Sequence, residues 1–141
     1  MAYRAFDAGL HLPGVGGILA RLGWDNFRHA PDSTRRSLTA PGVTGVVAVA
    51  IEAPEAPEAG EVVGFAQVFS DGVFQAHLGL LAVEEGWRRR GVGRGLVGEA
   101  FARVGAERMD LIASDESLAF YRSFRHREQA GFRIYSDREP D

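Results

Sequence analysis

The stretch of sequence that decides the fold runs Leu81-Ala82-Val83-Glu84-Glu85-Gly86-Trp87-Arg88-Arg89-Arg90-Gly91-Val92-Gly93-Arg94-Gly95-Leu96. It is typical of a strand that passes through a turn of glycines and arginines into a helix. The first turn of a helix has free N–H groups and the positive end of the helix dipole, which together favour an anion. Glycine at positions 91 and 93 lets a phosphate approach the backbone, and the arginines add positive charge. The stretch therefore predicts a phosphate-binding turn.

The helix after this turn is the best defined in the sequence. Apolar residues recur at helical spacing from Val92 onward; they are Leu96, Val97, Ala100, Phe101 and Val104. Beyond this helix we expect a short strand over Leu111–Ala113, an amphipathic helix over Leu118–Gln129 and a last strand over Phe132–Tyr135. Gly131 is expected to follow the end of the amphipathic helix.

Three strands are expected between Thr44 and Val83, and the last of them runs into the stretch quoted above. Thr44–Ile51 and Val62–Ser70 are β-branched apolar runs, typical of antiparallel neighbours. Val73–Val83 is apolar on both faces, which predicts a central strand, and the turn Asp71-Gly72 precedes it. The acidic, Pro-rich connector Glu52–Glu61 is expected to be a solvated loop.

The amino-terminal part adds a short strand over Tyr3–Asp7 and helices over Pro13–Trp24 and Asp32–Thr39, the second ended by Pro41-Gly42. The order of elements predicts an α/β or α+β fold in which one sheet is covered by helices. A chain of 141 residues is the size of one ordinary domain, so we expect a single domain over residues 1–141.

The composition excludes several classes of protein. With 45% hydrophobic and 25% charged residues the chain is typical of a globular protein. It has no apolar run of about eighteen residues and no signal peptide at its start, so we expect no membrane association and a cytoplasmic location. The absence of cysteine excludes disulfides and thiol nucleophiles. The net charge of −3 argues against a general nucleic-acid binder.

Two common phosphate-binding motifs do not fit the turn. In the dinucleotide fingerprint Gly-x-Gly-x-x-Gly the third glycine slot is here Leu96. The chain also contains no Gly-Lys-Ser or Gly-Lys-Thr, which a Walker loop needs. On its own, a run of three arginines is also compatible with a plain solvated turn.

The motif Arg88-x-x-Gly91-x-Gly93, preceded by Leu81-Ala82-Val83, resembles the signature of the GCN5-related N-acetyltransferase (GNAT) family. The resemblance covers roughly Thr44 to Tyr135. It implies a mixed, mostly antiparallel central sheet of about six strands covered by four helices, with acetyl-CoA as co-substrate. It also implies that the pantetheine arm pairs with the strand at Leu81, Ala82 and Val83 and that the loop holds the pyrophosphate through Arg88, Arg89, Arg90, Gly91, Val92, Gly93 and Arg94.

A second block, Phe120-Tyr121 followed by Gly131-Phe132, is similar to another segment of the same family. The resemblance implies that Tyr121 is the general acid that protonates the departing thiolate. The alternative is that Tyr121 is only one apolar position of an amphipathic helix. The family often has asparagine and alanine in the slots of Ser114 and Ser117, which are expected to contact the cofactor. The spacer Arg122–Ala130 is longer than usual and implies an extended helix.

An amine must lose a proton before it attacks a thioester, and His77 is the leading candidate base. The strand around it is similar to that of arylalkylamine N-acetyltransferases, which have histidine in the slots of His77 and Gly79. Residues 77, 79, 81 and 83 are expected to share one side of the strand, so that His77 lines the pantetheine cleft. A core histidine bonded to a backbone carbonyl is the alternative, and Glu84 and Asp71 are alternative bases.

The function expected from this resemblance is acetyl transfer from acetyl-CoA to the primary amine of a small molecule, by direct attack in a ternary complex. A strand amide, that of Leu81, would polarise the carbonyl. The alternatives are a non-catalytic acyl-CoA-binding or sensing module, a protein or peptide N-acetyltransferase, and a small nucleotide-binding domain. No metal is expected, because no histidine has metal-ligand spacing. The family usually has a seventh strand, for which little sequence follows the sixth expected here. An edge left exposed in this way invites pairing, which makes a homodimer one hypothesis.

Overall fold

The structure, a computed structural model, describes residues 1–24, 31–51 and 60–137. Most of the connector Glu52–Glu61 lies outside the described residues, as do Phe27 and His29. The chain divides into two compact units, Met1–Asp110 and Leu111–Asp141, which are described separately. Among the described residues, no helix is both long and apolar enough to cross a bilayer.

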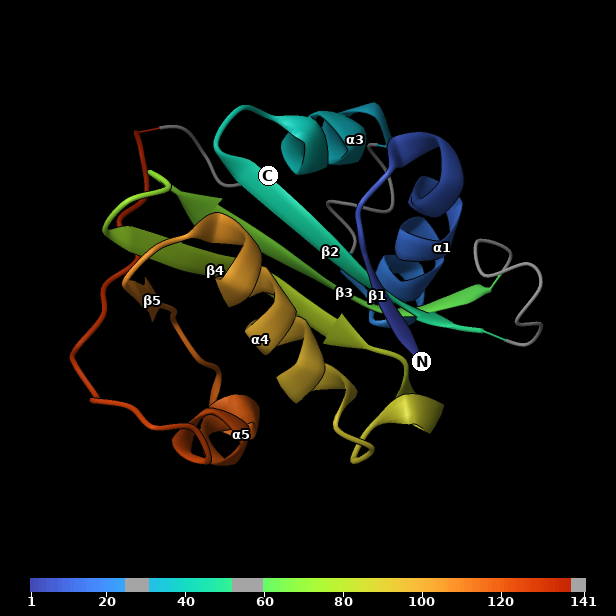
Figure 1. Ribbon diagram of the computed structural model, residues 1–141. Coiled ribbons are helices and arrows are strands. Elements are labelled where there is room, and N and C mark those ends of the chain that lie inside the picture. The colour runs from blue at the N-terminus through green and yellow to red at the C-terminus, as the bar shows by residue number, and fades with distance from the viewer. Residues whose placement is uncertain (25–30, 52–59, 138–141) are drawn as a thin grey trace. The chain divides into compact units, whose positions relative to one another are not determined.

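The first unit contains a five-stranded sheet in the order β1-β2-β3-β4-β5 (Figure 1). Neighbouring strands are antiparallel except β4 and β5, which are parallel. The strands are β1 (Ala2–Ala5), β2 (Val43–Ala50), β3 (Glu61–Ser70), β4 (Gln75–Val83) and β5 (Arg108–Asp110). The mixed, mostly antiparallel sheet expected from the resemblance is thus confirmed, with five strands instead of about six.

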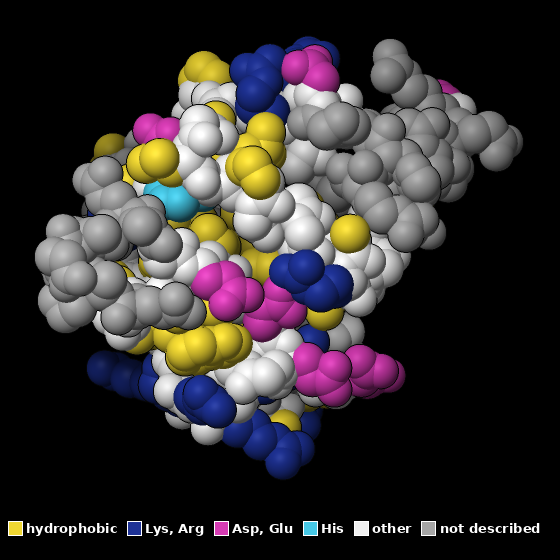
Figure 2. Space-filling view, turned by 90° about the vertical axis from the view of Figure 1, so that its right-hand side faces the viewer, with side chains coloured by type: hydrophobic (Ala, Val, Ile, Leu, Met, Phe, Trp, Pro, Cys, Tyr) yellow, Lys and Arg dark blue, Asp and Glu magenta, His cyan; other side chains and the backbone are white. Residues whose placement is uncertain are grey.

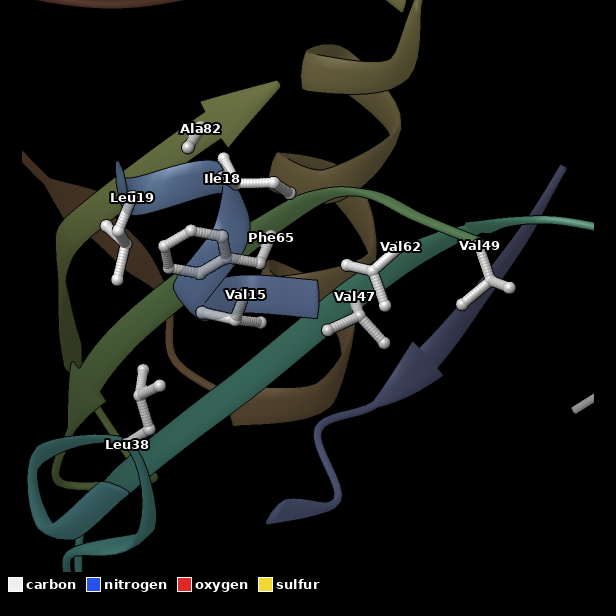
Figure 3. Packing of buried hydrophobic residues seen from close by; sticks show 9 residues of the cluster. All are labelled: Val15, Ile18, Leu19, Leu38, Val47, Val49, Val62, Phe65 and Ala82. Atoms are coloured by element: carbon white, nitrogen blue, oxygen red, sulfur yellow. The ribbon is translucent and has the colours of Figure 1, made fainter. Parts of the chain in front are cut away.

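Helices cover both faces of this sheet. Figure 1 shows α1 (Ala8–Arg21) and α3 (Pro31–Thr39) on one face and α4 (Val92–Val104) on the other. Between α1, α3 and the sheet lies a core of nine buried residues whose side chains point toward one another in Figure 3. They are Val15, Ile18, Leu19, Leu38, Val47, Val49, Val62, Phe65 and Ala82.

The helix α1 begins earlier than the sequence pattern predicts. It starts after Asp7, whose Oδ1 accepts the N–H of Leu10 at 3.0 Å. The N–H of Asp7 in turn donates to Nδ1 of His11 at 2.9 Å. Because this reciprocal pair satisfies N–H groups that a helix start leaves free, the helix forms before Pro13, which lies inside it.

Two glycines of α1 lie where a side chain would meet a neighbour. A Cβ atom added to Gly14 would lie 2.8 Å from Cβ of Val62 on β3, so Gly14 lets the helix approach the sheet closely. A Cβ atom added to Gly17 would lie 3.2 Å from the Arg21 guanidinium, which passes over it. Both glycines therefore serve packing.

The predicted strands over Thr44–Ile51 and Val62–Ser70 are confirmed as β2 and β3, which pair antiparallel. The central position of β4 between β3 and β5 is also confirmed. The turn before β4 is closed by Asp71, whose Oδ1 accepts the N–H groups of Val73, Phe74 and Gln75 at 2.8, 2.9 and 3.2 Å. The strand predicted over Leu111–Ala113 is wrong in position. The pairing residues are Arg108–Asp110, because the N–H groups of Glu107 and Arg108 both donate to the Phe74 carbonyl and fix the register.

The second unit contains a 3₁₀ turn (Asp115–Ser117) and α5 (Leu118–Arg122). The predicted helix to Gln129 is wrong, as is the extended helix over the spacer. After Phe124 the sequence offers no apolar residue before Ala130, so a longer helix would have no apolar stripe to bury. The predicted strand over Phe132–Tyr135 is also absent from the described residues, where no backbone pairs with it. Phe132 and Ile134 are 83% and 91% exposed.

Candidate functional site

The turn between β4 and α4 is folded by its own backbone. Glu85–Trp87 forms a single 3₁₀ turn, in which the N–H of Trp87 donates to the Glu84 carbonyl at 2.9 Å. Arg89 adopts a positive φ of 62°, and Gly91 follows with a φ of 81°. Gly91 is the N-cap residue of α4 and makes no side-chain cap. Glycine at the N-cap has no side chain that could cover the start of α4, which suits an anion-binding turn.

The three arginines of the turn lie differently. Arg88 Nε donates to the Val83 carbonyl at 3.3 Å and so turns back to the end of β4. The Arg90 guanidinium lies over the Trp87 ring, 5.0 Å from its centroid, where a cation is attracted to the aromatic face. All three side chains are exposed. A phosphate at the helix end would therefore meet a positively charged and accessible turn.

The third glycine of the turn serves packing. A side chain at Gly95 would overlap the Tyr3 ring and hydroxyl, so the glycine makes room for β1 against α4. Burial, and secondarily the charge of Glu99, raise the pKa of Tyr3. The three evenly spaced glycines Gly91, Gly93 and Gly95 therefore do not all serve the same purpose.

The strand β4 contains a β-bulge at Gly79. The register pairs Val68 with Leu78 and Gln67 with Leu80, so Gly79 is an extra residue on β4. A Cβ atom at Gly79 would lie 2.5 Å from Phe69 Cε2 and 3.1 Å from Gln67 Oε1. The bulge therefore needs glycine at this position.

The bulge overturns the expectation that residues 77, 79, 81 and 83 share a side. Gln67 Nε2 donates to Ser37 Oγ of α3 at 2.9 Å, which puts Gln67 on the face of α1 and α3. Phe69 lies two residues further on the same face, and its cross-strand partner is His77. Gly79, whose added Cβ atom would contact Phe69, faces the same way.

Leu81 and Val83 lie on the opposite face. Their partners on β3 are Ala66 and Gly64, and a Cβ atom at Gly64 would lie 3.0 Å from Leu96 of α4. The sequence pattern could not reveal this change of face, because a bulge depends on the register between two strands.

One edge of β4 is open over most of its length. The strand β5 pairs only with Gln75, Ala76 and His77. From Leu78 to Val83, the β5 side of β4 has no strand partner among the described residues. An extended ligand could pair with this edge as an added strand and lead directly to the turn at Arg88.

His77 is exposed and lies at the end of this open edge. Its ring centroid is 6.5 Å from that of Phe69. It lines an open hollow of about 570 Å³ in the first unit. The residues that line the hollow come from the start of β2, the end of β3, the start of β4 and β5; they are Pro41, Gly42, Phe69, Ser70, Asp71, Gln75, Ala76, His77 and Asp110. The alternative of a core histidine is therefore wrong.

The two alternative bases are already engaged. Arg21 of α1 forms an ion pair with the Glu84 carboxylate, whose side chain is only 17% exposed. The Asp71 carboxylate accepts backbone N–H groups, first of all that of Val73, which lower the pKa of Asp71. A carboxylate held in this way is a weaker proton acceptor than a free one. Figure 2 shows acidic and basic side chains next to one another near the centre of one face.

The second unit holds the remaining predicted residues. Tyr121 is half-buried, and burial raises its pKa. The Tyr121 ring packs edge-on against Phe120 at 4.9 Å between centroids. Ser114 Oγ donates to Ser117 Oγ at 3.1 Å, and Ser117 Oγ donates to the Ser114 carbonyl at 3.0 Å. Both serines thus shape the turn before α5.

Sequence reasoning missed Phe69 and Asp110 in the hollow, as well as Arg21 at the end of β4. Phe69 was predictable only as one apolar position of a strand. Asp110 belongs to a strand that the pattern places three residues later. Nothing in the helical spacing of α1 distinguishes Arg21 from a solvated arginine.

The chain is similar to known acetyltransferases. The family described as "Acetyltransferase (GNAT) domain" matches residues 44–125. No protein among the curated ones matches the chain. Among solved structures, that of AAC(6')-Iy in complex with the bisubstrate analog CoA-S-monomethyl-acetylneamine has 21% sequence identity and a TM-score of 0.74, with 97% of this chain and 97% of that chain covered.

Two bacterial structures are also similar. A putative acetyltransferase from Agrobacterium tumefaciens str. C58 has 23% identity and a TM-score of 0.73, with 96% of this chain and 100% of that chain covered. A putative acetyltransferase from Deinococcus radiodurans R1 has 24% identity and a TM-score of 0.71, with coverage of 95% and 87%. At these identities the likeness shows the fold.

The family match spans more than half of the chain and includes the turn between β4 and α4. The chain therefore belongs to the GNAT acetyltransferase family. It is an N-acetyltransferase of the GNAT type, which favours the enzyme over the non-catalytic sensing module and the nucleotide-binding domain.

Proposed function

We propose that the chain transfers the acetyl group of acetyl-CoA to the primary amine of a small molecule, by direct attack while both substrates are bound. The observation that carries this proposal is the open edge of β4 among the described residues, which leads into the turn of glycine and arginine before α4. A small-molecule acceptor is also the substrate type named in the bisubstrate complex of AAC(6')-Iy. A single domain over residues 1–141 and a cytoplasmic location belong to the same proposal.

The first unit would hold acetyl-CoA with backbone groups. The pantetheine arm pairs with β4 at Leu81, Ala82 and Val83, and the Leu81 amide polarises the thioester carbonyl. The pyrophosphate lies at the turn, against residues that offer amides or positive charge; they are Arg88, Arg89, Arg90, Gly91, Val92, Gly93 and Arg94. The left-handed conformation of Gly91 before the helical residues supports this arrangement, because successive left- and right-handed residues form the concave backbone nests that bind anions.

His77 would take the proton of the acceptor. Its exposure at the wall of the hollow supports this role, since a base must reach the ammonium. Glu84 and Asp71 are weaker candidates because their carboxylates are occupied by Arg21 and by backbone N–H groups.

Tyr121 would be the general acid that gives a proton to the leaving thiolate of coenzyme A. The amine nitrogen attacks the carbonyl carbon, the carbon–sulfur bond breaks, and the Tyr121 hydroxyl protonates the departing thiolate. The products are an amide and coenzyme A. The Tyr121 hydroxyl is protonated at neutral pH, as an acid requires, since its pKa is raised by burial from an ordinary value of 10.0. Ser114 and Ser117 are proposed to contact coenzyme A. No acetyl-enzyme forms on cysteine, since the chain has none.

Calorimetric titration with acetyl-CoA tests the first half of the proposal. We expect saturable binding that weakens as salt rises, because phosphates on arginines are screened by salt. No binding at millimolar acetyl-CoA would refute the proposal.

Thiol release with a panel of amines tests the second half. Small primary amines should support release, and peptide N-termini should not. Turnover on peptides alone would favour the alternative, a protein or peptide N-acetyltransferase. A homodimer stays a hypothesis, which sedimentation of the same sample tests.

A further inference from the structure

The backbone of Glu84 joins the sheet to the turn before α4. Its N–H donates to the Val63 carbonyl of β3 at 2.8 Å, and its carbonyl accepts the N–H of Trp87 at 2.9 Å. Glu84 is also the N-cap residue of the 3₁₀ turn that follows. It therefore ends the pairing with β3 and begins the turn, so a movement of Glu84 moves the residues after it.

The side chain of Glu84 points to the face of the sheet that α1 covers. Ala82, two residues earlier on β4, is buried in the core under α1, and side chains two residues apart on a strand share a face. On this face Arg21, the last residue of α1, forms an ion pair with the mostly buried Glu84 carboxylate. A carboxylate that has lost much of its water depends on such a partner.

The Arg21 side chain lies over a glycine of its own helix. A Cβ atom at Gly17 would lie 3.2 Å from Nη1 and 3.3 Å from Nη2 of Arg21. Residues four apart share one side of a helix, so Gly17 leaves the space in which the guanidinium lies. The hydrogen bond to Glu84 is the main cause that raises the pKa of Arg21, and the charge of Glu61 at the start of β3 adds to it. Two carboxylates thus attract this guanidinium.

The other end of the turn is fixed by packing on the opposite face of the sheet. Val92 and Leu96 of α4 are buried. A Cβ atom at Gly64 of β3 would lie 3.4 Å from Val92 Cγ1 and 3.0 Å from Leu96 Cδ1, so α4 lies directly on β3. Between these two ends the three arginines of the turn are exposed. The position of the turn therefore depends on its ends, and the ion pair with Arg21 holds the first of them.

The proposed acetyl-CoA site includes residues on both sides of Glu84. The pantetheine arm would pair with Leu81–Val83, and the pyrophosphate would lie at the turn after Glu84. A shift at Glu84 changes the distance between these two parts of the site. If the turn were free to move, it would have to be ordered on binding, which costs affinity.

We propose that Arg21 is a positioning residue for acetyl-CoA. Its ion pair with Glu84 fixes the residue at which β4 passes into the turn. The pair thereby sets the amides at the start of α4 relative to the strand edge that pairs with the pantetheine arm. This inference rests on the proposed acetyl-CoA site, to which it adds a residue of α1.

Calorimetric titration with acetyl-CoA separates positioning from a plain effect of charge. Arg21→Ala and Glu84→Ala both remove the ion pair, but the first removes a positive charge near the turn and the second a negative charge. Positioning predicts that each variant binds acetyl-CoA more weakly, on the order of tenfold, and that the double variant binds no more weakly than the weaker single variant. Weaker binding by Arg21→Ala together with tighter binding by Glu84→Ala would overturn the inference.

Three further variants complete the set, with urea midpoints as a check on folding. Arg21→Met keeps the apolar stem of the side chain and should bind acetyl-CoA as weakly as Arg21→Ala. Arg21→Lys keeps a charge that can pair with Glu84, so it should stay within about threefold of the parent chain. Arg35→Ala, the matched control, removes an arginine whose ion pair with Asp32 lies within α3, and should change nothing. Equal losses in Arg35→Ala and Arg21→Ala would contradict the proposal.

Hydrogen exchange in the free chain tests the same idea without a ligand. The amides of Trp87 and Arg88 donate to the carbonyls of Glu84 and Glu85. Their exchange should be about tenfold faster in Arg21→Ala than in the parent, whereas the amides of β2 should not change. Faster exchange in a chain that does not bind acetyl-CoA supports the fixing of the turn by Arg21 and refutes the proposed site. Unchanged exchange with unchanged acetyl-CoA affinity overturns the inference alone.

Discussion

Alanine at Gly14 and, separately, at Gly16 adds the same methyl group to the same helix in two different surroundings. At Gly14 the new Cβ atom would lie 2.8 Å from Cβ and 2.9 Å from Cγ2 of Val62, whereas at Gly16 no atom lies within 4 Å. The Val62 Cβ atom is fixed to the backbone of β3 and cannot turn away. The helix α1 must therefore move from the sheet to accommodate alanine at Gly14.

The expected difference follows from two opposing contributions. Each exchange gains helix propensity, about 0.8–1.0 kcal/mol. Only Gly14→Ala overpacks the core, at a cost of about 1–3 kcal/mol. Because the helix contribution is common to both variants, the difference between their free energies of unfolding is the overpacking alone, about 1–3 kcal/mol. Gly16→Ala should be more stable than the parent chain.

Urea unfolding measures this difference. With a slope of about 1–3 kcal/mol per molar, typical of small proteins, the midpoints of the two variants should differ by about 1 M. In the double variant Gly14→Ala, Val62→Gly the Cβ atom at position 62 that the new alanine would meet is gone, so the two changes should couple by on the order of 1 kcal/mol. Equal midpoints with equal slopes for Gly14→Ala and Gly16→Ala would refute the close approach of α1 to β3.

Three further outcomes are expected. Tyr121→Phe should keep KM for acetyl-CoA and lower kcat by about 10²–10⁴, the usual worth of a general acid; an unchanged kcat in the thiol-release assay would remove Tyr121 from the mechanism. Gly91→Ala forces a left-handed φ on alanine, at about 1–2 kcal/mol of stability by urea unfolding, and should weaken acetyl-CoA binding in calorimetry, whereas Gly98→Ala should do neither. Burial lowers the pKa of His11 in the folded chain below its ordinary 6.5. Below about pH 6.5 the unfolded chain therefore binds more protons than the folded chain. The stability that the neutral His11 contributes is complete above this pH and is lost as the pH falls toward the pKa of the folded state. Urea midpoints between pH 8 and 5 should show this loss, and His11→Gln should flatten it.

The strands and helices that bury one continuous apolar face were predictable from the sequence. The runs of β2 and β3 are short and rich in β-branched residues, which favours strands, and the apolar stripe of α4 carries a helical period. The turn between β4 and α4 was predictable as a strand-to-helix junction with a left-handed glycine, whereas its binding of phosphate stays a prediction. These features depend on residues close in sequence.

The features that the sequence did not reveal depend on residues far apart. A side chain at Gly95 would overlap Tyr3, and a side chain at Gly14 would overlap Val62. The residues next to each glycine in the sequence therefore do not reveal why glycine is needed there. The prediction that the helix starting at Leu118 continues to Gln129 was wrong for a different reason. Phe120 and Phe124 start an apolar stripe that nothing continues, and Arg122 turns to Glu128 at 2.5 Å.

The bulge at Gly79 is the feature on which the proposed chemistry depends most. In a regular strand, His77, Leu81 and Val83 would all point to one face, and the donor arm and the acceptor would compete for it. The extra residue leaves His77 and the hollow on the face of α1 and α3 and turns Leu81 and Val83 toward α4. A single strand can then offer its open edge to one substrate and one face to the other. Because Phe69 occupies the space of a Gly79 side chain, the same glycine that permits the bulge also leaves the Phe69 ring uncovered.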